Sequence, residues 1–575
     1  MRICGLKLTH DGAIAVIENG KLLFSIEMEK VNNNPRYTAI EDTSTIEAVL
    51  ASQGLSVNDI DHFAIDGWGG YDQEALAIQP RLEIGEGDLN KLSITHNRKN
   101  IYLDIAQYHE RTLTHNVMQQ WVCNGLPVGN AVHSYSSFLH VTGHVMSAYC
   151  SSPFAARGES SYVLVWDGGM YPRLYFVDAA NKSVENMGPV FLLIGNIYTI
   201  FSQHFGPFKV AGGFAKDSLS VAGKVMAYIA LGQVRKELYE VFDKVYEEHY
   251  NVPMGFANIF AAEFSKKIEG HGYSDEDILC SFHHYLGELL VSKLQKKISR
   301  FNKSSKNICF AGGCALNIKW NSDIRESKLF DEVYVPPFPN DSGSAIGAAC
   351  AYMWLHTQHQ SLEWDVYAGP ALVQQVPETD WAQSSCSPEQ LALLLHTVGE
   401  PVVFLNERAE LGPRALGNRS ILAPAVLPEM KDVLNYVKKR EPYRPVSPIC
   451  LEDAAAEIFD PGCSDPYMLF DHQVKPEWMD RIPAICHLDG SARLQTTNEQ
   501  ENPVIAALLR AYYELSGIPL LCNTSANHNG SGFFPSVSAA ADWGRVNYVW
   551  SDGYLYERNE KIVFMQLNMD VVSLH

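Results

Sequence analysis

Short apolar runs separated by polar turn residues open the chain. Two of them, "RICGLKL" (residues 2–8) and "AIAVIENGKLLFSIEME" (13–29), predict strands around an Asn19–Gly20 turn, because Asn-Gly is a strong hairpin signal. Further apolar runs predict strands at 61–66 ("DHFAID"), 161–169 ("SYVLVWDGG") and 307–313 ("NICFAGG").

Helical periodicity follows in the middle of the chain, from about residue 223 to 250 and again over 276–301. The second stretch places apolar side chains on one helix face, namely Ile278, Phe282, Leu286, Leu289, Leu290 and Leu294. Residues 332–354 then predict a strand, a Pro/Asn loop and a helix. Because strands and helices alternate, the predicted class is α/β.

The chain has 575 residues, too many for a single hydrophobic core, so two or more domains are expected. A polar, loop-like stretch follows "YAGPAL", at 374–390. We therefore predict a boundary near residue 370, with one domain at 1–370 and a second mixed α and β domain at 371–575.

Composition and charge exclude several classes of protein. The formal net charge is −21, which disfavours a non-specific nucleic-acid binder, since phosphate contacts need clustered Lys and Arg. No apolar stretch is long enough for a membrane helix, and the start turns polar too early for a signal peptide. The 12 cysteines are scattered without a C-x-x-C pair, as expected for free thiols in a reducing cytoplasm.

Two histidines, His140 and His144, stand four residues apart in "HVTGHVMSAYCSSPF". In a helix this spacing puts both imidazoles on one face. They could hold a metal, which would need further ligands from elsewhere in the chain, or they could pack in a core.

Polar residues beside glycines mark other candidate positions. His10 and Asp11 lie in the turn of the first hairpin, where the histidine beside an aspartate could act as a general base. Asp167 follows a strand, and Asp341 lies at the start of a predicted helix, either as an N-cap or as a ligand. Gly312 and Gly313, with Asn317 nearby, follow the strand at 307–311, where close approach to a nucleotide or an ordinary junction are both possible.

The C-terminal part carries a concentration of basic residues. Residues 401–450 hold eight Lys/Arg and five acids, a charge of +3 within a chain of net −21. The arginines of "GPRALGNRS" and "KKREPYRPVSP" stand beside Gly and Pro, so fixed loops could aim them at phosphate or carboxylate. "HLDGSARLQT" adds Arg493, and "LLCNTSANHNG" follows an apolar strand with a polar tip that could bind a ligand or form a plain turn.

Taken together and in order, these blocks resemble the ATP-dependent O-carbamoyltransferases of natural-product biosynthesis, a family that includes nodulation-factor carbamoyltransferases. The resemblance covers nearly the whole chain, and its most specific blocks are "GPRALGNRS" and "REPYRPVSP". The opening "HDGAIAVIENGKLLFSIEMEK" looks most like the branch that carbamoylates cephem and ansamycin hydroxyls.

The resemblance implies an actin-like (duplicated ribonuclease-H-like) N-terminal domain followed by a YrdC-like domain. The second domain would make carbamoyl adenylate from carbamoyl phosphate and ATP, with Mg²⁺ accompanying the ATP. The first domain would transfer the carbamoyl group to a hydroxyl of a small natural product, and it would hold a metal, typically Fe²⁺. No nucleic acid or membrane partner is expected, and the oligomeric state and the acceptor are left open.

The family's functional residues map onto this chain as follows. The metal ligands would be His140, His144, Asp167 and Asp341, with His10 as the base for the acceptor hydroxyl. The first domain's nucleotide-binding residues would be Gly168, Gly169, Lys224, Gly312, Gly313 and Asn317. The carbamoyl-phosphate and ATP site would use Arg414, Lys438, Arg440, Arg444, Arg493, Asn523, Ser525 and Asn527, with Arg444 and Ser525 as catalytic residues.

Some positions depart from the family pattern near the expected nucleotide and acceptor regions. "AGK" stands at 222–224, where relatives usually carry a glutamate near the lysine. "GSGFF" at 530–534 replaces a usual Gly-Glu-Pro, and "WDGGM" at 166–170 lacks the acid that often follows its glycines. Alternatives are a tRNA threonylcarbamoyl-transfer enzyme, disfavoured by the acidic charge, and a hydrogenase-maturation carbamoyltransferase, disfavoured because its cysteine-rich zinc modules are missing. A non-catalytic nucleotide-sensing protein is the third, and it would not need the C-terminal basic set.

Overall fold

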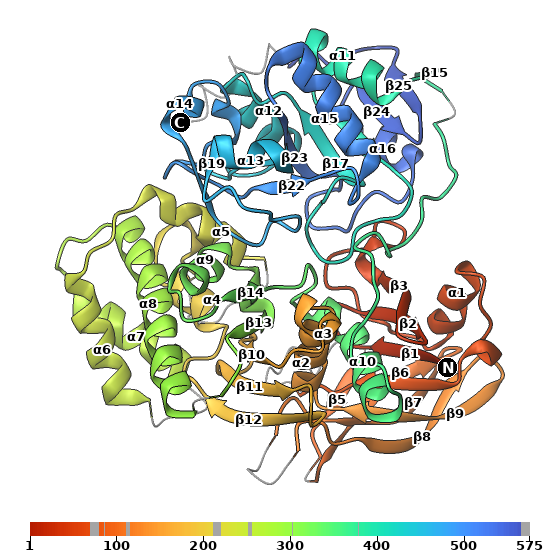
Figure 1. The fold of residues 1–575 in the computed structure, drawn as a ribbon, viewed down its shortest axis with the longest axis vertical. Helices are drawn as coiled ribbons and strands as arrows, with labels where there is room; N and C mark the ends of the chain where they lie inside the picture. Colours follow the sequence, from red (N-terminus) through yellow and green to blue (C-terminus); the bar gives the residue numbers. More distant parts are fainter. Residues whose placement is uncertain are drawn as a thin grey trace. The chain divides into compact units, whose positions relative to one another are not determined.

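The computed structural model describes residues 1–69, 80–85, 87–110, 116–210, 220–250, 256–301, 303–377 and 379–564. The chain divides into two compact units (Figure 1). The first unit comprises Met1–Met28 and Tyr37–Ala368, and the second comprises Glu29–Arg36 and Gly369–His575. Both units mix strands and helices, which confirms the predicted α/β class.

The first sheet of the first unit has the order β3-β2-β1-β4-β9-β8. Its strands are β1 (Arg2–Lys7), β2 (Ala13–Glu18), β3 (Lys21–Glu27), β4 (His62–Asp66), β8 (Trp121–Val128) and β9 (Ala131–Phe138). The first three run antiparallel, and β1, β4 and β9 are parallel. The predicted hairpin turn is confirmed: Asn19 and Gly20 have φ of 49° and 87°, as a tight turn between β2 and β3 requires.

The second sheet of this unit has the order β12-β11-β10-β13-β14. Its strands are β10 (Ser161–Val165), β11 (Arg173–Asp178), β12 (Ser183–Pro189), β13 (Asn307–Ala311) and β14 (Glu332–Tyr334). It again begins with three antiparallel strands, and β10, β13 and β14 are parallel. The first five strands of the other sheet follow the same scheme, so one arrangement occurs twice in this unit.

Two helices of the first unit meet at small residues. Gly143 lies in α2 (His140–Cys150) and Gly347 in α10 (Ser344–His356), and a Cβ on Gly347 would stand only 1.8 Å from the Gly143 carbonyl oxygen. In the same way, a Cβ on Gly5 of β1 would stand 1.9 Å from the carbonyl oxygen of Ala345. The sequence therefore lets α10 lie directly against both α2 and β1.

The remaining helices of the first unit are α1 (Ser44–Ser52), α3 (Pro153–Ala156), α4 (Ile197–Ser202), α5 (Ala222–Tyr228), α6 (Glu237–His249), α7 (Phe256–Ile268), α8 (Asp275–Phe301) and α9 (Ile318–Glu326). The helix predicted over 276–301 is confirmed as α8. The periodic stretch at 223–250 forms two helices, because the chain turns at Gly232, where a Cβ would meet the Glu276 carbonyl oxygen at 2.1 Å. A small sheet of β5 (Arg81–Glu83), β6 (Leu89–His96) and β7 (Lys99–Ala106) was not predicted.

The second unit is built on a sheet of order β15-β25-β24-β16-β17-β23-β18-β22. Its strands are β15 (Trp381–Ser385), β16 (Val402–Leu405), β17 (Arg419–Ala423), β18 (Ser447–Leu451), β22 (Gln495–Thr497), β23 (Leu520–Ser525), β24 (Tyr548–Ser551) and β25 (Tyr554–Arg558). A smaller sheet contains β19 (Phe459–Asp460), β20 (His472–Val474) and β21 (Ser491–Ala492). The helices are α11 (Pro388–Val398), α12 (Glu429–Val437), α13 (Glu452–Ile458), α14 (Pro476–Met479), α15 (Pro503–Ser516) and α16 (Val537–Trp543).

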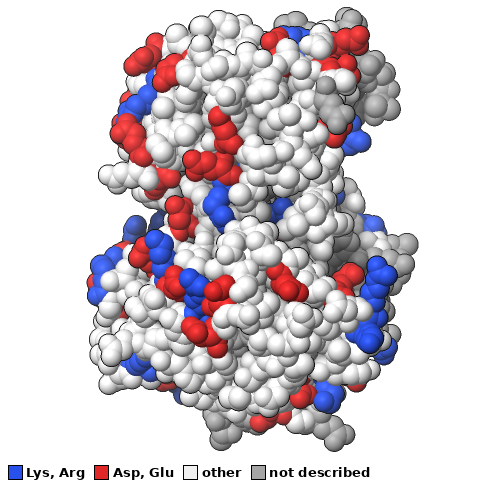
Figure 2. Space-filling model, turned by 90° about the vertical axis from the view of Figure 1, so that its right-hand side faces the viewer, with Lys and Arg blue, Asp and Glu red and all other residues white. Residues whose placement is uncertain are grey.

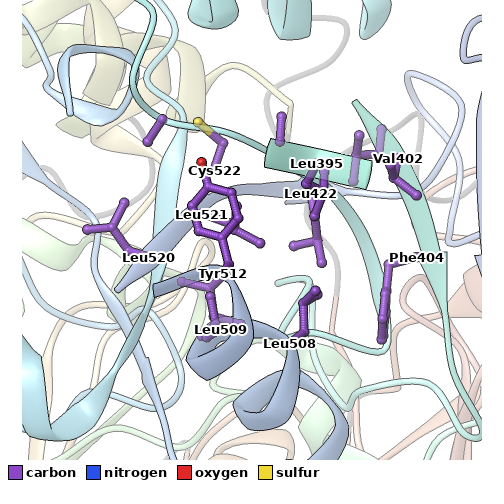
Figure 3. Packing of buried hydrophobic residues seen from close by; sticks show 14 of the residues in the cluster. Leu395, Val402, Phe404, Leu422, Leu508, Leu509, Tyr512, Leu520, Leu521 and Cys522 are labelled. Carbon is purple, nitrogen blue, oxygen red and sulfur yellow. The ribbon is translucent and has the colours of Figure 1, made fainter. Parts of the chain in front are cut away.

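The core of the second unit lies between this sheet and its helices. Figure 3 shows Leu508, Leu509 and Tyr512 of α15 beside apolar side chains of the strands. The strand side chains include Val402, Phe404, Leu422, Leu520 and Leu521, all at most 1% exposed. Burial on this scale fixes the strands, and so fixes the loops at their ends.

Residues 29–36 leave the first unit and pack in the second. The Lys30 ammonium donates to the carbonyl oxygens of Glu410 (2.5 Å) and Gly412 (2.8 Å). The amide of Gly532 donates to the carbonyl oxygen of Asn34 at 3.0 Å. The pattern of polar and apolar positions gives no sign of this excursion, which depends on contacts with residues almost 400 to 500 positions away.

The surface charge, the cysteines and the helix lengths can be compared with the sequence expectations. On the face drawn in Figure 2, Lys and Arg side chains are interspersed with Asp and Glu. The 12 cysteines are free thiols, as predicted. Among the described residues, no helix is both long enough and apolar enough to span a membrane.

Candidate functional site

The two predicted histidines and two predicted aspartates come together in the first unit. His140 opens α2 directly after β9, and His144 follows one turn later. Asp167 follows β10, and Asp341 stands just before α10. All four side chains are buried, and one ligand atom from each lies within 4.8 Å of the others.

The two imidazoles point the same ring nitrogen at the carboxylates. The Nε2 atoms of His140 and His144 are 3.2 Å apart. They lie 3.4 and 3.5 Å from Asp341 Oδ1, and 3.9 and 4.0 Å from the oxygens of Asp167. Two nitrogen and two oxygen donors converging in this way are a donor set for a borderline divalent cation.

The start of α2 is fixed by its neighbours. The amides of His140 and Val141 donate to the carbonyl oxygens of Gln107 and Tyr108, at 3.0 and 2.9 Å. The His140 Nδ1 atom lies 2.7 Å from Asp66 Oδ2. When Nδ1 carries the proton that bonds Asp66, the Nε2 lone pair is left facing the cluster, as in many metal sites.

A buried lysine lies behind the cluster. The Lys7 ammonium is 3.0 Å from Asp341 Oδ2 and 3.4 Å from Asp66 Oδ2. Burial alone would raise the pKa of Asp341, but the positive charges of Lys7 and His140 outweigh it and hold that pKa well below its usual range. Burial would likewise lower the pKa of His140, but the carboxylates of Asp66 and Asp341 raise it well above its usual value.

Asp167 is held from two sides. The hydroxyl of Tyr108 donates to one carboxylate oxygen, and the amide of Gly313 donates to the other at 2.7 Å. Asp341 is not the N-cap of α10, because that position is Gly343. Asp341 is therefore not used as the cap of this helix and can serve as a ligand.

His10 lies at the edge of this cluster, in the turn between β1 and β2. Its Nδ1 atom is 2.9 Å from Asp11 Oδ2 and its Nε2 atom is 3.5 Å from Asp341 Oδ2. Its side chain is 34% exposed, whereas Asp341 is 7% exposed. His10 is thus the member of this group that a ligand from solvent can reach, and its ring stands edge-on to Trp68.

The predicted nucleotide residues of the first unit divide into two groups. Gly168 and Gly169 directly follow Asp167, and Gly312 has φ of 90° with no room for a Cβ, which would stand 2.4 Å from the Trp166 carbonyl oxygen. Asn317 is the N-cap of α9, and its Oδ1 accepts from two backbone amides. Lys224 lies instead on α5, which packs against α4 and α8.

In the second unit, the strand register gathers the predicted basic residues at one end of the sheet. Ser447 at the start of β18 pairs with Asn523 near the end of β23, and the parallel strand β22 starts beside β18. Arg444 and Arg493 stand just before β18 and β22, and Ser525 ends β23. The loop that carries Arg414 leads into β17, which starts opposite Ser525.

Glu410 organises the "GPRALGNRS" loop. Its Oε1 accepts from the amides of Leu416, Asn418 and Arg419, at 2.7 to 3.0 Å. The Arg419 guanidinium is 1% exposed and donates only to backbone carbonyl oxygens among its hydrogen-bond partners. Arg419 therefore holds the loop together, whereas Arg414 lies within the loop that it holds.

Lys438 positions the polar tip of β23. Its ammonium donates to the carbonyl oxygens of Ser525 (2.7 Å) and Asn527 (2.6 Å), and to the Asn527 side chain. Three acceptors use all three ammonium protons. The Ser525 hydroxyl in turn donates to Asn527 Oδ1 at 2.7 Å. Asn523 is turned inward and donates to Ala415 and Gln495.

The arginines predicted for this site form a group of half-buried cations, namely Arg414, Arg440, Arg444 and Arg493. Burial, and then repulsion from Arg493 and Arg36, lowers the pKa of Arg414 well below its usual range. Burial and repulsion from Arg444 lower the pKa of Arg440 to about 9 and that of Arg493 to about 10. Cations that destabilise one another in this way form a ready site for an anion.

Several residues of both sites were missed from the sequence. Lys7 is a charged residue within an apolar strand, and Asp66 ends the strand predicted at 61–66, so both left a weak signal. Tyr108 left none. Arg36 left none either, because its neighbours in the second unit are remote in sequence.

Comparison with known proteins agrees with the sequence blocks over almost the whole chain. The family model "Carbamoyltransferase N-terminus" matches residues 2–350, and "Carbamoyltransferase C-terminus" matches residues 394–556. Nodulation protein U of Rhizobium tropici is 48% identical over 97% of this chain and 96% of its own length. A 3'-hydroxymethylcephem-O-carbamoyltransferase of Streptomyces clavuligerus is 30% identical over 94% of this chain and 95% of its own length.

The sequence identities change which branch of the family the chain is expected to resemble. The opening block looks most like the cephem and ansamycin branch, but over the full chain the identity with the nodulation protein is higher. Among solved structures, the match to the activator of the 2-hydroxyisocaproyl-CoA dehydratase from Clostridium difficile covers 62% of this chain and 94% of that protein, at 11% identity and a TM-score of 0.32. On the two matched family models and the full-length relatives, this chain belongs to the carbamoyltransferase family.

Proposed function

We propose that the chain is an ATP-dependent O-carbamoyltransferase that acts on a hydroxyl of a small natural product. The second unit would hydrolyse carbamoyl phosphate with one water to carbamate and phosphate, and would then join the carbamate oxygen to the α-phosphorus of ATP, which gives carbamoyl adenylate and releases pyrophosphate. The first unit would pass the carbamoyl group to the acceptor oxygen and release AMP. The observation that carries the proposal is the group of half-buried, mutually repelling arginines in the second unit of a carbamoyltransferase-family chain.

The second unit would bind the phosphates of both co-substrates. Arginine forks at the start of β18 and β22 suit phosphate oxygens, and their fixed positions place positive charge where negative charge builds up during the reaction. The Ser525–Asn527 tip would border the same site. Since Lys438 donates all its protons within the protein, we assign it to positioning that tip rather than to binding phosphate. Mg²⁺ would accompany the ATP.

The first unit would hold a divalent metal ion between His140, His144, Asp167 and Asp341. The fit is supported by four converging buried donors and by the Asp66 bond that orients His140. An ion there would act as a Lewis acid toward an oxygen of the bound reactants. Fe²⁺ is our preferred candidate, since imidazole and carboxylate ligands both suit it.

His10 would take the proton of the acceptor hydroxyl. Its Nδ1 faces Asp11, so a proton on Nδ1 leaves Nε2 as the basic atom, which lies on the Asp341 side. The glycines that follow β10 and β13 would allow the adenylate to approach the backbone closely. Asn317 would contribute by capping the start of α9. Its side-chain oxygen would not contact the ligand, because it already accepts from two backbone amides.

We further propose that the first unit is actin-like and the second YrdC-like, with functional domains near 1–370 and 371–575. The strand order that occurs twice in the first unit supports the duplicated actin-like assignment. A tRNA-modifying role is not favoured, because the chain carries net charge −21 and its relatives include a cephem carbamoyltransferase.

The test is a paired assay on the intact protein. Pyrophosphate release from ATP should depend on added carbamoyl phosphate, and one member of a panel of hydroxylated scaffolds should gain a carbamoyl group by mass spectrometry. The panel should include saccharides and a hydroxymethylcephem. Pyrophosphate release that ignores carbamoyl phosphate would exclude the proposed adenylate-forming step and favour a nucleotide-sensing protein.

A further inference from the structure

One short piece of the N-terminal sequence forms part of the second unit beside its anion site. The Arg36 amide donates to the Gly530 carbonyl oxygen at 2.9 Å, and Pro35 bridges Ser531 in antiparallel fashion. The Ser531 carbonyl oxygen accepts from the side chain of Asn527 at 2.6 Å. Arg36 is therefore attached to the loop that continues from the Ser525–Asn527 tip.

The same piece is fixed at its other end. The Lys30 ammonium donates to the carbonyl oxygens of Glu410 and Gly412, in the loop that carries Arg414. Gly532 packs so closely that a Cβ there would stand 1.8 Å from the Glu29 carbonyl oxygen. The departure "GSGFF" at 530–534 thus lies where residues 29–36 pack, and its second glycine is required by that contact.

The charge of Arg36 acts on Lys438, which positions the β23 tip, and on two of the predicted phosphate-binding arginines. After burial and the repulsion from Arg440, Arg36 lowers the pKa of Lys438, and it also contributes to the lowered pKa values of Arg414 and Arg444. Within the described part of the chain, the Arg36 guanidinium has no carboxylate within ion-pair distance and no hydrogen-bond acceptor. Its half-buried positive charge is therefore not neutralised by a neighbouring acid.

We infer that Arg36 is a phosphate-binding residue of the second unit's anion site. Among the described residues, the leading electrostatic interactions at this site join six cations, Arg36, Arg414, Lys438, Arg440, Arg444 and Arg493, and they include two carboxylates, Glu441 and Asp465. Such an excess suits a ligand with several negative charges, such as a di- or triphosphate, better than a single carboxylate. The inference deepens the proposed function and rests on it for the identity of the natural ligand.

A binding role and a purely structural role of the Arg36 side chain predict different effects of its removal on the stability of the ligand-free protein. The backbone bonds of residues 34–36 do not need that side chain, and the guanidinium repels three neighbouring cations. Removal of the guanidinium should therefore leave the ligand-free protein as stable as before, or more stable. A side chain that only held the segment in place would lower the unfolding temperature when removed.

The test measures binding of inorganic pyrophosphate to the full-length protein by calorimetry, with unfolding temperatures in its absence and presence. Arg36→Ala should weaken binding about tenfold or more, since hydrogen bonds to charged groups are worth about that factor. Arg36→Lys should recover part of the loss, because it restores the charge without the planar fork. Arg510→Ala is the matched control, since Arg510 is exposed in the same unit and pairs only with exposed acids among its ion-pair partners.

Pyrophosphate affinity that is unchanged in Arg36→Ala overturns the inference. A loss of affinity that comes with a lowered unfolding temperature of the ligand-free variant also overturns it, as does a parent protein that does not bind pyrophosphate. If Arg36→Ala alone loses affinity but the parent makes no pyrophosphate from carbamoyl phosphate and ATP, the proposed function fails and the Arg36 assignment stands.

Discussion

His10 is more exposed than the four buried residues beside it, and this difference defines its chemistry. His140 and His144 are fully buried and point their Nε2 atoms at one another and at the carboxylates. His10 bonds Asp11 on one side and faces Asp341 on the other, with a third of its side chain exposed. A histidine oriented by one carboxylate and open to solvent is placed to take a proton from a bound hydroxyl.

We predict that His10→Asn separates the two half-reactions. An alcohol is a poor nucleophile until its proton is removed, so carbamoylated product should fall about 10²–10⁴-fold, as is typical for loss of a general base. Carbamoyl-phosphate-dependent pyrophosphate release should persist, because the cations of the second unit are untouched. Both rates are measured in one reaction, by mass spectrometry and by a pyrophosphate assay.

The same substitution at exposed His271 is the control for that variant. It should change neither rate. If both rates fall together in folded His10→Asn protein, His10 serves nucleotide handling instead. If neither falls, it is a turn residue, and the base lies elsewhere.

At the residue scale, the sequence indicated candidate metal ligands but gave little indication of the residues that hold those ligands in place. The His140–His144 spacing left a metal site and core packing both open, and only the family resemblance assigned the pair to a metal site and selected Asp167 and Asp341 as its other ligands among many acids. Lys7 and Asp66 could not be ranked from the sequence, because their importance arises from burial against Asp341 and His140. Such contacts depend on the tertiary fold.

The elements of the first unit bring the four candidate ligands together through close helix packing. Gly347 of α10 contacts the backbone of α2 at Gly143. His140 and His144 lie on one helix, and Asp341 stands just before the other. The separation of the two helices therefore sets the distance between the imidazoles and this carboxylate, which is 3.4 to 3.5 Å.

We predict that Gly347→Ala weakens metal binding without changing any ligand. The new methyl group would meet three backbone atoms of Gly143 at 1.8 to 2.7 Å, so α10 must move away from α2. Overpacking of this kind costs about 1–3 kcal/mol or more of the free energy of unfolding. Metal content by elemental analysis and the unfolding temperature should both fall.

Gly223→Ala is the matched control, because Gly223 also lies in a helix and has nothing within 4 Å of the position that a Cβ would take. Alanine there should be neutral or stabilising by about 0.5–1 kcal/mol, since it favours the helix. Full metal content in Gly347→Ala would show that the spacing of α2 and α10 does not determine the site.

Strands and long helices of this fold were predictable because their apolar pattern is local. The first hairpin and α8 followed directly from the periodicity. The break between α5 and α6 was not predictable, because it depends on the contact of Gly232 with Glu276 in another helix. Residues 29–36 were missed for the same reason, since their hydrogen bonds reach Gly412 and Gly530.

On the scale of the whole molecule, each unit carries one kind of chemistry. The first unit holds the buried His/Asp cluster, and the second holds the cations that suit phosphates. Carbamate and its adenylate are unstable in water, so under the proposed function, making and using the adenylate within one chain would protect the reactive group from hydrolysis. This division predicts that the two half-reactions respond differently to loss of the metal.

We predict that metal removal stops transfer but spares adenylate formation. After dialysis against a chelator and transfer to Mg²⁺ buffer, carbamoyl-phosphate-dependent pyrophosphate release should continue near the parent rate. Acceptor carbamoylation should be lost and should return with added Fe²⁺ or another borderline cation, because two imidazole ligands favour such ions over Mg²⁺. Elemental analysis at each stage shows whether recovery follows occupancy. Equal loss of both rates would place a required ion in the second unit and contradict the separation, whereas unaltered transfer by metal-free protein would remove the His/Asp cluster from the reaction.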